Sequence, residues 1–208
     1  MNYEEDKPNS YCGIFGIYGS ETASAQAYYG LHALQHRGQE ASGIVTRSFN
    51  GDNRAHFNIV KGEGLVSEVF ADHNLLTEQL FGNSAIGHNR YSTTGSAKSR
   101  KNIQPFMVNY RMGNLAIGHN GNLTNAKELR EELVNEGAIF QTTSDTEVIL
   151  HLIARSKLDN QIDQIMEALR RIEGAYCLVI LTDDKLIAAR DPLGFRPLSL
   201  GRLEDAFL

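Results

Sequence analysis

The chain has 208 residues, of which 41% are hydrophobic and 22% are charged, a composition typical of a globular domain and not of a disordered chain. Its net charge of −5 gives no support to a nucleic-acid-binding surface or to binding at an anionic membrane. The longest apolar run, AYCLVIL, is far shorter than the roughly 20 residues that cross a bilayer, so we expect no membrane span.

The first segment, residues 1–11, reads MNYEEDKPNSY and is acidic, without the apolar core of a secretory signal. Only two cysteines follow, Cys12 and Cys177, and without a secretion signal this pattern indicates free thiols in a reducing compartment. We therefore expect a cytoplasmic protein.

In chain order, short runs rich in Ile, Val, Phe and Tyr are separated by Gly and Asn, as expected of strands and turns. These predicted strands are 12–19, 41–48, 55–62, 84–91, 105–110, 114–121, 175–181, 185–190 and 198–203. Apolar residues at helical spacing predict helices at 24–37, 126–136, 145–156 and 161–172. Two capping-box patterns, Asn125 with Glu128 and Ser144 with Glu147, predict where two of these helices start.

The predicted strands occur as hairpin-like neighbours and do not alternate with helices. This order predicts an α+β fold of mainly antiparallel sheets covered by helices, and not a doubly wound parallel sheet. Two such sheets with helices outside would form a four-layer sandwich, but the periodicity leaves the layering open.

The cysteine at position 12 stands between the polar leader and a Gly-rich apolar run. A cysteine nucleophile reacts as the thiolate and needs a base, yet no histidine stands in a cysteine-protease signature. Removal of the leader would give Cys12 a free α-amino group, whose pKa of about 7.7–8.0 suits a general base. The alternative is a small, buried, apolar residue in the first strand.

Three further stretches have a functional and a structural interpretation. Asn120-Gly121 could present an amide and a backbone N–H to one oxygen as an oxyanion hole, or could form a hairpin turn. Arg90, which precedes a polar loop, could bind a carboxylate or be solvated. Asp145 could bind an ammonium group or favour a helix N-terminus electrostatically. Together with Cys12, the functional interpretations describe one ligand, glutamine.

Seven segments carry a family resemblance: CGIFGI, LQHRGQEASGI, GHNRYSTTG, NIQPF, AIGHNGNLTN, TTSDTEVILHLIA and RDPLGFRPLSLG. Together they span residues 12–203 and resemble the class II glutamine amidotransferase domain, specifically that of the glutamine phosphoribosylpyrophosphate amidotransferases. LQHRGQEASGI and RYSTTG favour this group over glucosamine-6-phosphate synthase and asparagine synthetase, which share the CGI start.

The resemblance implies the αββα sandwich of the N-terminal nucleophile hydrolases. It also implies that residues 1–11 are a propeptide and that residues 12–208 are the glutaminase domain, in a fragment that lacks a C-terminal phosphoribosyltransferase domain. The resemblance implies that Cys12 is the nucleophile and that Asn120 and Gly121 form the oxyanion hole. It implies that Arg90 binds the α-carboxylate of glutamine and that Asp145 binds its α-amino group. Thr93 matches a position in the glutamine loop, and Arg37 matches a position near the nucleophile.

The function implied is glutamine hydrolysis through a cysteinyl thioester, with the ammonia used to make phosphoribosylamine in the first step of purine synthesis. Two alternatives stay open, namely a glutaminase serving another acceptor such as a sugar phosphate and a non-catalytic domain with the same fold. The partners implied are L-glutamine, the C-terminal domain and further copies of the chain. No cofactor is expected in this chain, whereas the resemblance places Mg²⁺, and in some members a 4Fe–4S cluster, in the C-terminal half.

Overall fold

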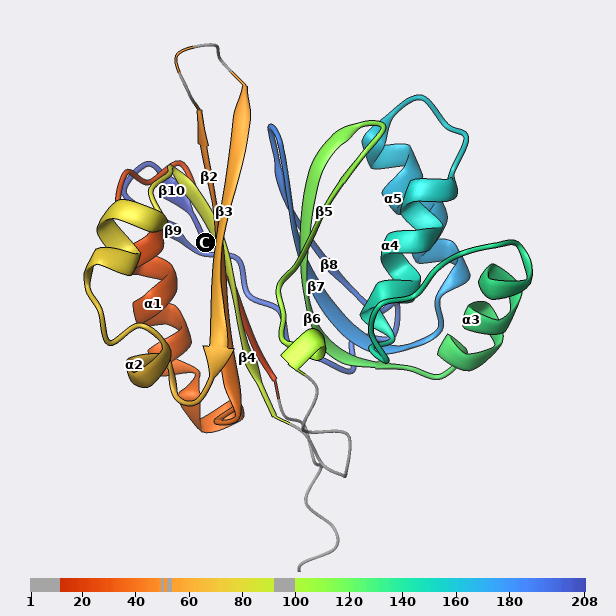
Figure 1. Ribbon diagram of the computed structural model, residues 1–208, viewed down its shortest axis with the longest axis horizontal. Coiled ribbons are helices and arrows are strands. Elements are labelled where there is room, and N and C mark those ends of the chain that lie inside the picture. The colour runs from red at the N-terminus through yellow and green to blue at the C-terminus, as the bar shows by residue number, and fades with distance from the viewer. Residues whose placement is uncertain (1–11, 50, 52–53, 92–99) are drawn as a thin grey trace, which may run out of the picture.

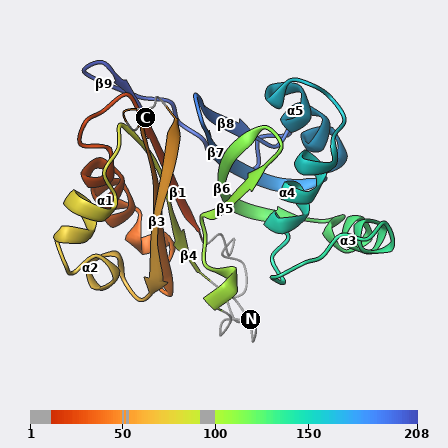
Figure 2. The same ribbon diagram turned by 45° about the horizontal axis from the view of Figure 1, so that its top comes forward.

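The computed structural model describes residues 12–49, 51, 54–91 and 100–208. Its strands form two sheets that face each other, and its helices cover the outer face of each sheet (Figures 1 and 2). The strands are β1 (Gly13–Tyr18), β2 (Ala41–Phe49), β3 (Ala55–Glu63), β4 (Ser84–Arg90), β5 (Phe106–Tyr110), β6 (Gly113–Leu123), β7 (Gly174–Thr182), β8 (Leu186–Arg190), β9 (Arg202–Leu203) and β10 (Ala206–Phe207).

The helices are of several lengths. The α-helices are α1 (Ala23–Ala33), α2 (Val66–Val69), α3 (Ala126–Asn135), α4 (Thr146–Arg155) and α5 (Gln161–Arg171). Short 3-10 turns follow at Gln35–Arg37 and Arg100–Asn102, and a single π-helical turn spans Leu75–Gln79.

The first sheet has the order β3-β2-β4-β1-β10-β9 and the second has the order β5-β6-β7-β8. Every paired neighbour is antiparallel. In Figure 1, α1 and α2 lie outside the first sheet, whereas α3, α4 and α5 lie on the outer side of the second. The layers are therefore helix, sheet, sheet and helix, which confirms the predicted α+β fold and supplies the layering that periodicity left open.

Successive residues of the central strands pack into different cores, because side chains alternate between the two faces of a strand. On β2, Ile44 joins the core under α1, whereas Val45 joins the core between the sheets. On β6, Ala116 faces the other sheet and Ile117 faces the helices. A strand covered on both faces in this way can read as a nearly continuous apolar run, as β7 does.

Close packing of α1 onto β1 depends on a glycine in the helix. A Cβ added at Gly30 would lie 2.4 Å from the ring of Phe15, so a larger residue there would push the helix away from the strand. The glycine therefore lets α1 pack closely against β1, the strand that Cys12 directly precedes.

Some predicted elements were wrong in detail. The helix predicted at 24–37 ends at Ala33, and residues 35–37 form a separate 3-10 turn. The strand predicted at 198–203 is reduced to Arg202–Leu203, because residues 197–200 line the cavity between the sheets. No strand or helix was predicted at 64–83, where the structure has the four-residue α2 and the π-helical turn, both too short to show periodicity.

The two predicted capping boxes do not form, although α3 and α4 begin at the predicted places. The Asn125 side chain instead donates to the carbonyl of Arg171 and accepts from the backbone N–H of Glu173. Glu147 accepts from the backbone N–H groups of Gln141 and Thr142, so it organises the preceding turn.

Candidate functional site

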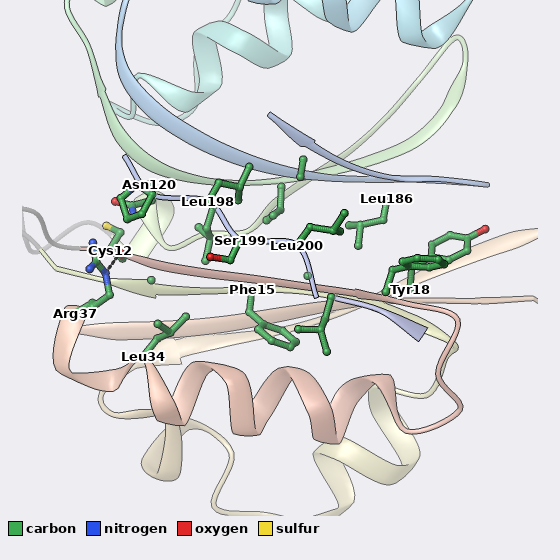
Figure 3. A pocket seen from close by; sticks show the side chains of 18 of the residues that line it. Cys12, Phe15, Tyr18, Leu34, Arg37, Asn120, Leu186, Leu198, Ser199 and Leu200 are labelled. Carbon is green, nitrogen blue, oxygen red and sulfur yellow. Dashed lines mark hydrogen bonds between the residues drawn. The ribbon is translucent and has the colours of Figure 1, made fainter. Parts of the chain in front are cut away.

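Cys12 lies immediately before β1, a central strand of the first sheet. The β1–β4 register pairs Gly13 with Asn89, which places Cys12 beside the end of β4. Its Sγ lies 3.9 Å from the carbonyl oxygen of Tyr91, and its own carbonyl accepts a 3.2 Å hydrogen bond from Nε of Arg37 (Figure 3). Arg37 therefore holds the backbone at Cys12, in agreement with its predicted place near this residue.

Burial raises the pKa of the Cys12 thiol above its ordinary value. The positive charge of Arg90 opposes this shift and the carboxylate of Asp145 reinforces it, so both groups act electrostatically on the sulfur. The thiol form therefore prevails at neutral pH, and nucleophilic attack would require a base that removes the proton.

Asn120 and Gly121 lie inside β6 and not in a hairpin turn, so the turn alternative is wrong. They pair with Cys177 and Tyr176 of β7. A Cβ at Gly121 would lie 2.1 Å from the carbonyl oxygen of Ala175, and its φ of +156° is one that side chains rarely adopt. The strand therefore admits only glycine directly after Asn120.

The side chain of Asn120 faces Cys12 from the opposite sheet. Both residues and Arg37 line one end of a cavity of about 930 Å³ between the sheets. Figure 3 shows Asn120 next to Cys12 at this end, whereas mostly apolar side chains, such as Phe15 and Leu186, line the remainder together with a few polar ones. The arrangement brings a thiol and an amide donor together at one end of the cavity.

Arg90 is the last residue of β4 and is half-buried beside Cys12. A guanidinium at this place could bind a carboxylate bidentately. The other predicted residue of the same region, Thr93, lies outside the described residues.

Asp145 directly precedes α4, and its carboxylate is held both by β6 and by Thr146, the first residue of the helix. Oδ2 accepts a 3.0 Å hydrogen bond from the backbone N–H of Leu123, and Oδ1 lies 3.5 Å from Nδ1 of His119. Burial disfavours the carboxylate, but the interactions with His119 and with the backbone N–H groups of Leu123 and Thr146 outweigh it and lower the pKa of Asp145. The side chain keeps 23% exposure, so an ionised carboxylate is available to a cation.

Two buried histidines, His88 and His119, were missed by sequence reasoning. Each stands in the same short pattern, AIGHN, at 85–89 on β4 and at 116–120 on β6. The two patterns cross between the sheets, where Nε2 of His88 lies 3.1 Å from the carbonyl oxygen of His119. Recurrence of this pattern in two predicted strands is the signal that could have found them.

His88 is expected to make the folded state sensitive to acid. Burial lowers the pKa of His88 to about 3, and the positive charges of Arg90 and Lys61 act in the same direction. Below pH of about 6.5 the unfolded chain therefore binds a proton that the folded chain does not. The free energy of unfolding should fall by up to about 1.4 kcal/mol per pH unit from this group as the pH drops towards 3.

The measurement is urea unfolding of the protein and of His88→Gln between about pH 5 and pH 8. The Gln amide can donate to the His119 carbonyl as Nε2 of His88 does, but it does not titrate. We expect a shallower loss of stability in acid for the variant. Equal slopes for the two proteins would contradict a buried neutral His88.

Within the described ranges, no group of three or more His, Cys, Asp or Glu side chains could hold a metal ion. The same part of the chain contains no helix long and apolar enough to cross a membrane. Cys12 and Cys177 are both free thiols.

Residues 88–208 match the family described as "Glutamine amidotransferase domain". Amidophosphoribosyltransferase 2, chloroplastic, of Arabidopsis thaliana is 52% identical over 198 residues, which are 95% of this chain and 34% of that protein. An amidophosphoribosyltransferase of Lacticaseibacillus casei is 46% identical over 201 residues, which are 97% of this chain and 100% of that sequence.

A solved structure of glutamine phosphoribosylpyrophosphate amidotransferase from B. subtilis, complexed with ADP and GMP, is also similar. Its TM-score is 0.84 at 45% sequence identity, over 93% of this chain and 40% of that one. The likeness confirms the predicted fold, the αββα sandwich of the N-terminal nucleophile amidotransferases. This chain spans 34% of the length of the Arabidopsis protein and 40% of the length of the B. subtilis protein.

Proposed function

Because the chain belongs to the amidophosphoribosyltransferase family and carries its glutamine amidotransferase domain, we propose that it hydrolyses the side-chain amide of L-glutamine. The observation that carries the proposal is the meeting of Cys12 and Asn120, from opposite sheets, at one end of one cavity. A thiol beside an amide donor is the pair that acyl transfer from an amide requires.

In the proposed reaction, residues 1–11 have been removed and Cys12 begins the chain. Its α-amino group, directly or through water, takes the thiol proton while Sγ bonds to the glutamine side-chain carbon. The resulting oxyanion accepts hydrogen bonds from the Asn120 side chain and the Gly121 backbone N–H. The carbon–nitrogen bond then breaks, the nitrogen takes the proton, and ammonia leaves. Water next hydrolyses the thioester and yields glutamate and the free thiol.

Substrate orientation is assigned to two charged residues and a loop residue. Arg90 binds the α-carboxylate and Asp145, ionised and partly exposed, binds the α-ammonium group. Both act electrostatically on Cys12, which supports their place around the same ligand. Thr93, by resemblance, contributes from the glutamine loop.

In the whole protein, the ammonia is proposed to serve the synthesis of phosphoribosylamine from phosphoribosyl pyrophosphate. The names of the relatives support this acceptor, as does the greater length of the Arabidopsis relative. A C-terminal phosphoribosyltransferase domain with Mg²⁺, a 4Fe–4S cluster there, association of copies and a cytoplasmic location stay predictions from the sequence.

The test is ammonia release from L-glutamine by the full protein, with and without residues 1–11. We expect release only from protein that begins at Cys12, because an amide nitrogen at that residue cannot act as a base. L-Asparagine, one methylene shorter, should be a poor substrate. Absence of release from the processed protein would refute the function, and equal release with the leader attached would refute the α-amino base. Addition of phosphoribosyl pyrophosphate and Mg²⁺ then tests the acceptor.

A further inference from the structure

A buried hydrogen-bonding network surrounds the carboxylate of Asp145. His119, 2% exposed, places Nδ1 3.0 Å from the hydroxyl of Thr146 and 3.5 Å from Oδ1 of Asp145. The Thr146 hydroxyl also lies 3.5 Å from the same Oδ1 and accepts a 3.2 Å hydrogen bond from the Gln104 amide. The same Gln104 side chain accepts from the backbone N–H of His119 at 2.8 Å. Ring, hydroxyl and carboxylate are thus fixed relative to one another.

The surrounding hydrogen bonds indicate which ring nitrogen of His119 carries the proton. An ionised carboxylate only accepts, so Oδ1 of Asp145 requires a donor from the Thr146 hydroxyl or from Nδ1 of His119. With the proton on Nδ1, both can donate towards Oδ1, and Nε2 keeps only a lone pair. Within the described part of the chain Nε2 has no hydrogen-bond partner. With the proton on Nε2 instead, a buried N–H would lack an acceptor there, which is the costlier arrangement.

We propose that His119 is a positioning residue that donates from Nδ1 to hold the Asp145 carboxylate towards the substrate, and so sets the affinity for the α-ammonium group. The proposal rests on the proposed function, because it deepens the role of Asp145 in glutamine binding. His119 itself touches no substrate atom, and its influence on the reaction passes through Asp145.

Three substitutions separate this role from simple packing. His119→Ala removes the donor, and His119→Gln places an amide near the Nε2 position and not near Nδ1. His119→Asn places an amide N–H near the Nδ1 position. We expect the first two to raise KM for glutamine roughly ten- to a hundred-fold, the effect of losing a hydrogen bond to a charged group, with kcat little changed. His119→Asn should recover most of that affinity.

A second readout does not depend on catalysis. The Kd of L-glutamate and of glutarate, which lacks the α-amino group, is measured by calorimetry on protein that begins at Cys12. The unsubstituted protein should prefer glutamate, His119→Ala and His119→Gln should lose most of this preference, and His119→Asn should keep it. The matched control is Gln164→Ala, a fully buried polar side chain on α5 that accepts a hydrogen bond from the Tyr110 hydroxyl and is no part of the network around Asp145. It should keep the preference.

The outcomes are distinguishable. Unsubstituted protein that neither hydrolyses glutamine nor binds glutamate would overturn both the proposed function and this inference. An active unsubstituted protein whose His119→Ala and His119→Gln variants keep the glutamate preference would overturn the inference alone. Equal losses in His119→Asn and His119→Gln, or a fall in kcat at unchanged KM, would also overturn it, because neither follows from a donor at Nδ1.

Discussion

Substitution of Cys12 by alanine is expected to reduce glutamine hydrolysis at least about 10⁴-fold, since removal of a nucleophile that acts as part of a unit eliminates the covalent route. The residue precedes β1 with its backbone held by Arg37, so a smaller side chain should leave the fold intact. Single-turnover ammonia release and circular dichroism on the same preparation would measure both effects.

The matched control is the other thiol of the chain. Cys177 is fully buried on β7, where its Sγ lies 3.5 Å from the carbonyl oxygens of Arg196 and Pro197. Burial raises its pKa, so it should be unreactive, and Cys177→Ala should keep hydrolysis within a few-fold. A folded Cys12→Ala protein that still hydrolyses glutamine at near-normal rate would exclude the thioester mechanism.

The second large effect is expected at Asn120. Its substitution by alanine should lower kcat by about 10²–10³-fold with a smaller change in KM, because an oxyanion donor acts mainly on the transition state. Steady-state kinetics with glutamine, analysed for kcat and KM separately, provides the measurement.

Asn122 is the matched control on the same strand. It lies two residues beyond Asn120 on β6 but is exposed, and it lines no part of the cavity that holds Cys12. Asn122→Ala should therefore leave kcat within a few-fold. If Asn120→Ala changed KM alone, the side chain would bind the substrate in its ground state and would not stabilise an oxyanion.

Much of the fold could be predicted because strand and helix periods are local properties of the sequence. The runs that became β2, β4, β6 and β7 and the helix α5 were predicted close to their observed bounds. The layering could not be predicted from the residues, since Ile44 and Val45 are both apolar and only the structure shows that they face different cores. The residues 197–200 failed as a strand because they line the cavity and pair with no strand.

The site was predicted unevenly for a similar reason. The dipeptide Asn120-Gly121 is typical of a hairpin turn, and only the pairing of Gly121 with Tyr176 shows that it lies within a strand. Asp145 was placed correctly before a helix, yet its partners, Leu123 and His119, lie on a strand that the sequence does not connect to it. Long-range contacts of this kind depend on how the two sheets pack.

The burial of Cys12 supports the proposed removal of residues 1–11. Burial raises the pKa of Cys12, and no group of the described part of the chain is seen to accept its proton except the carbonyl of Tyr91. A free α-amino group at residue 12 would supply the base at the atom where it is needed. Removal of residues 1–11 is thus the step that we propose activates the nucleophile, because it frees the α-amino group of Cys12.

The most direct test is the intact mass of the purified full protein before and after treatment with the glutamine analogue 6-diazo-5-oxo-norleucine. Our account predicts a species that begins at Cys12 and gains one adduct, and it predicts no adduct on Cys12→Ala. A processed, folded protein that gains no adduct, or that carries it on Cys177, would contradict the assignment of Cys12 as the nucleophile.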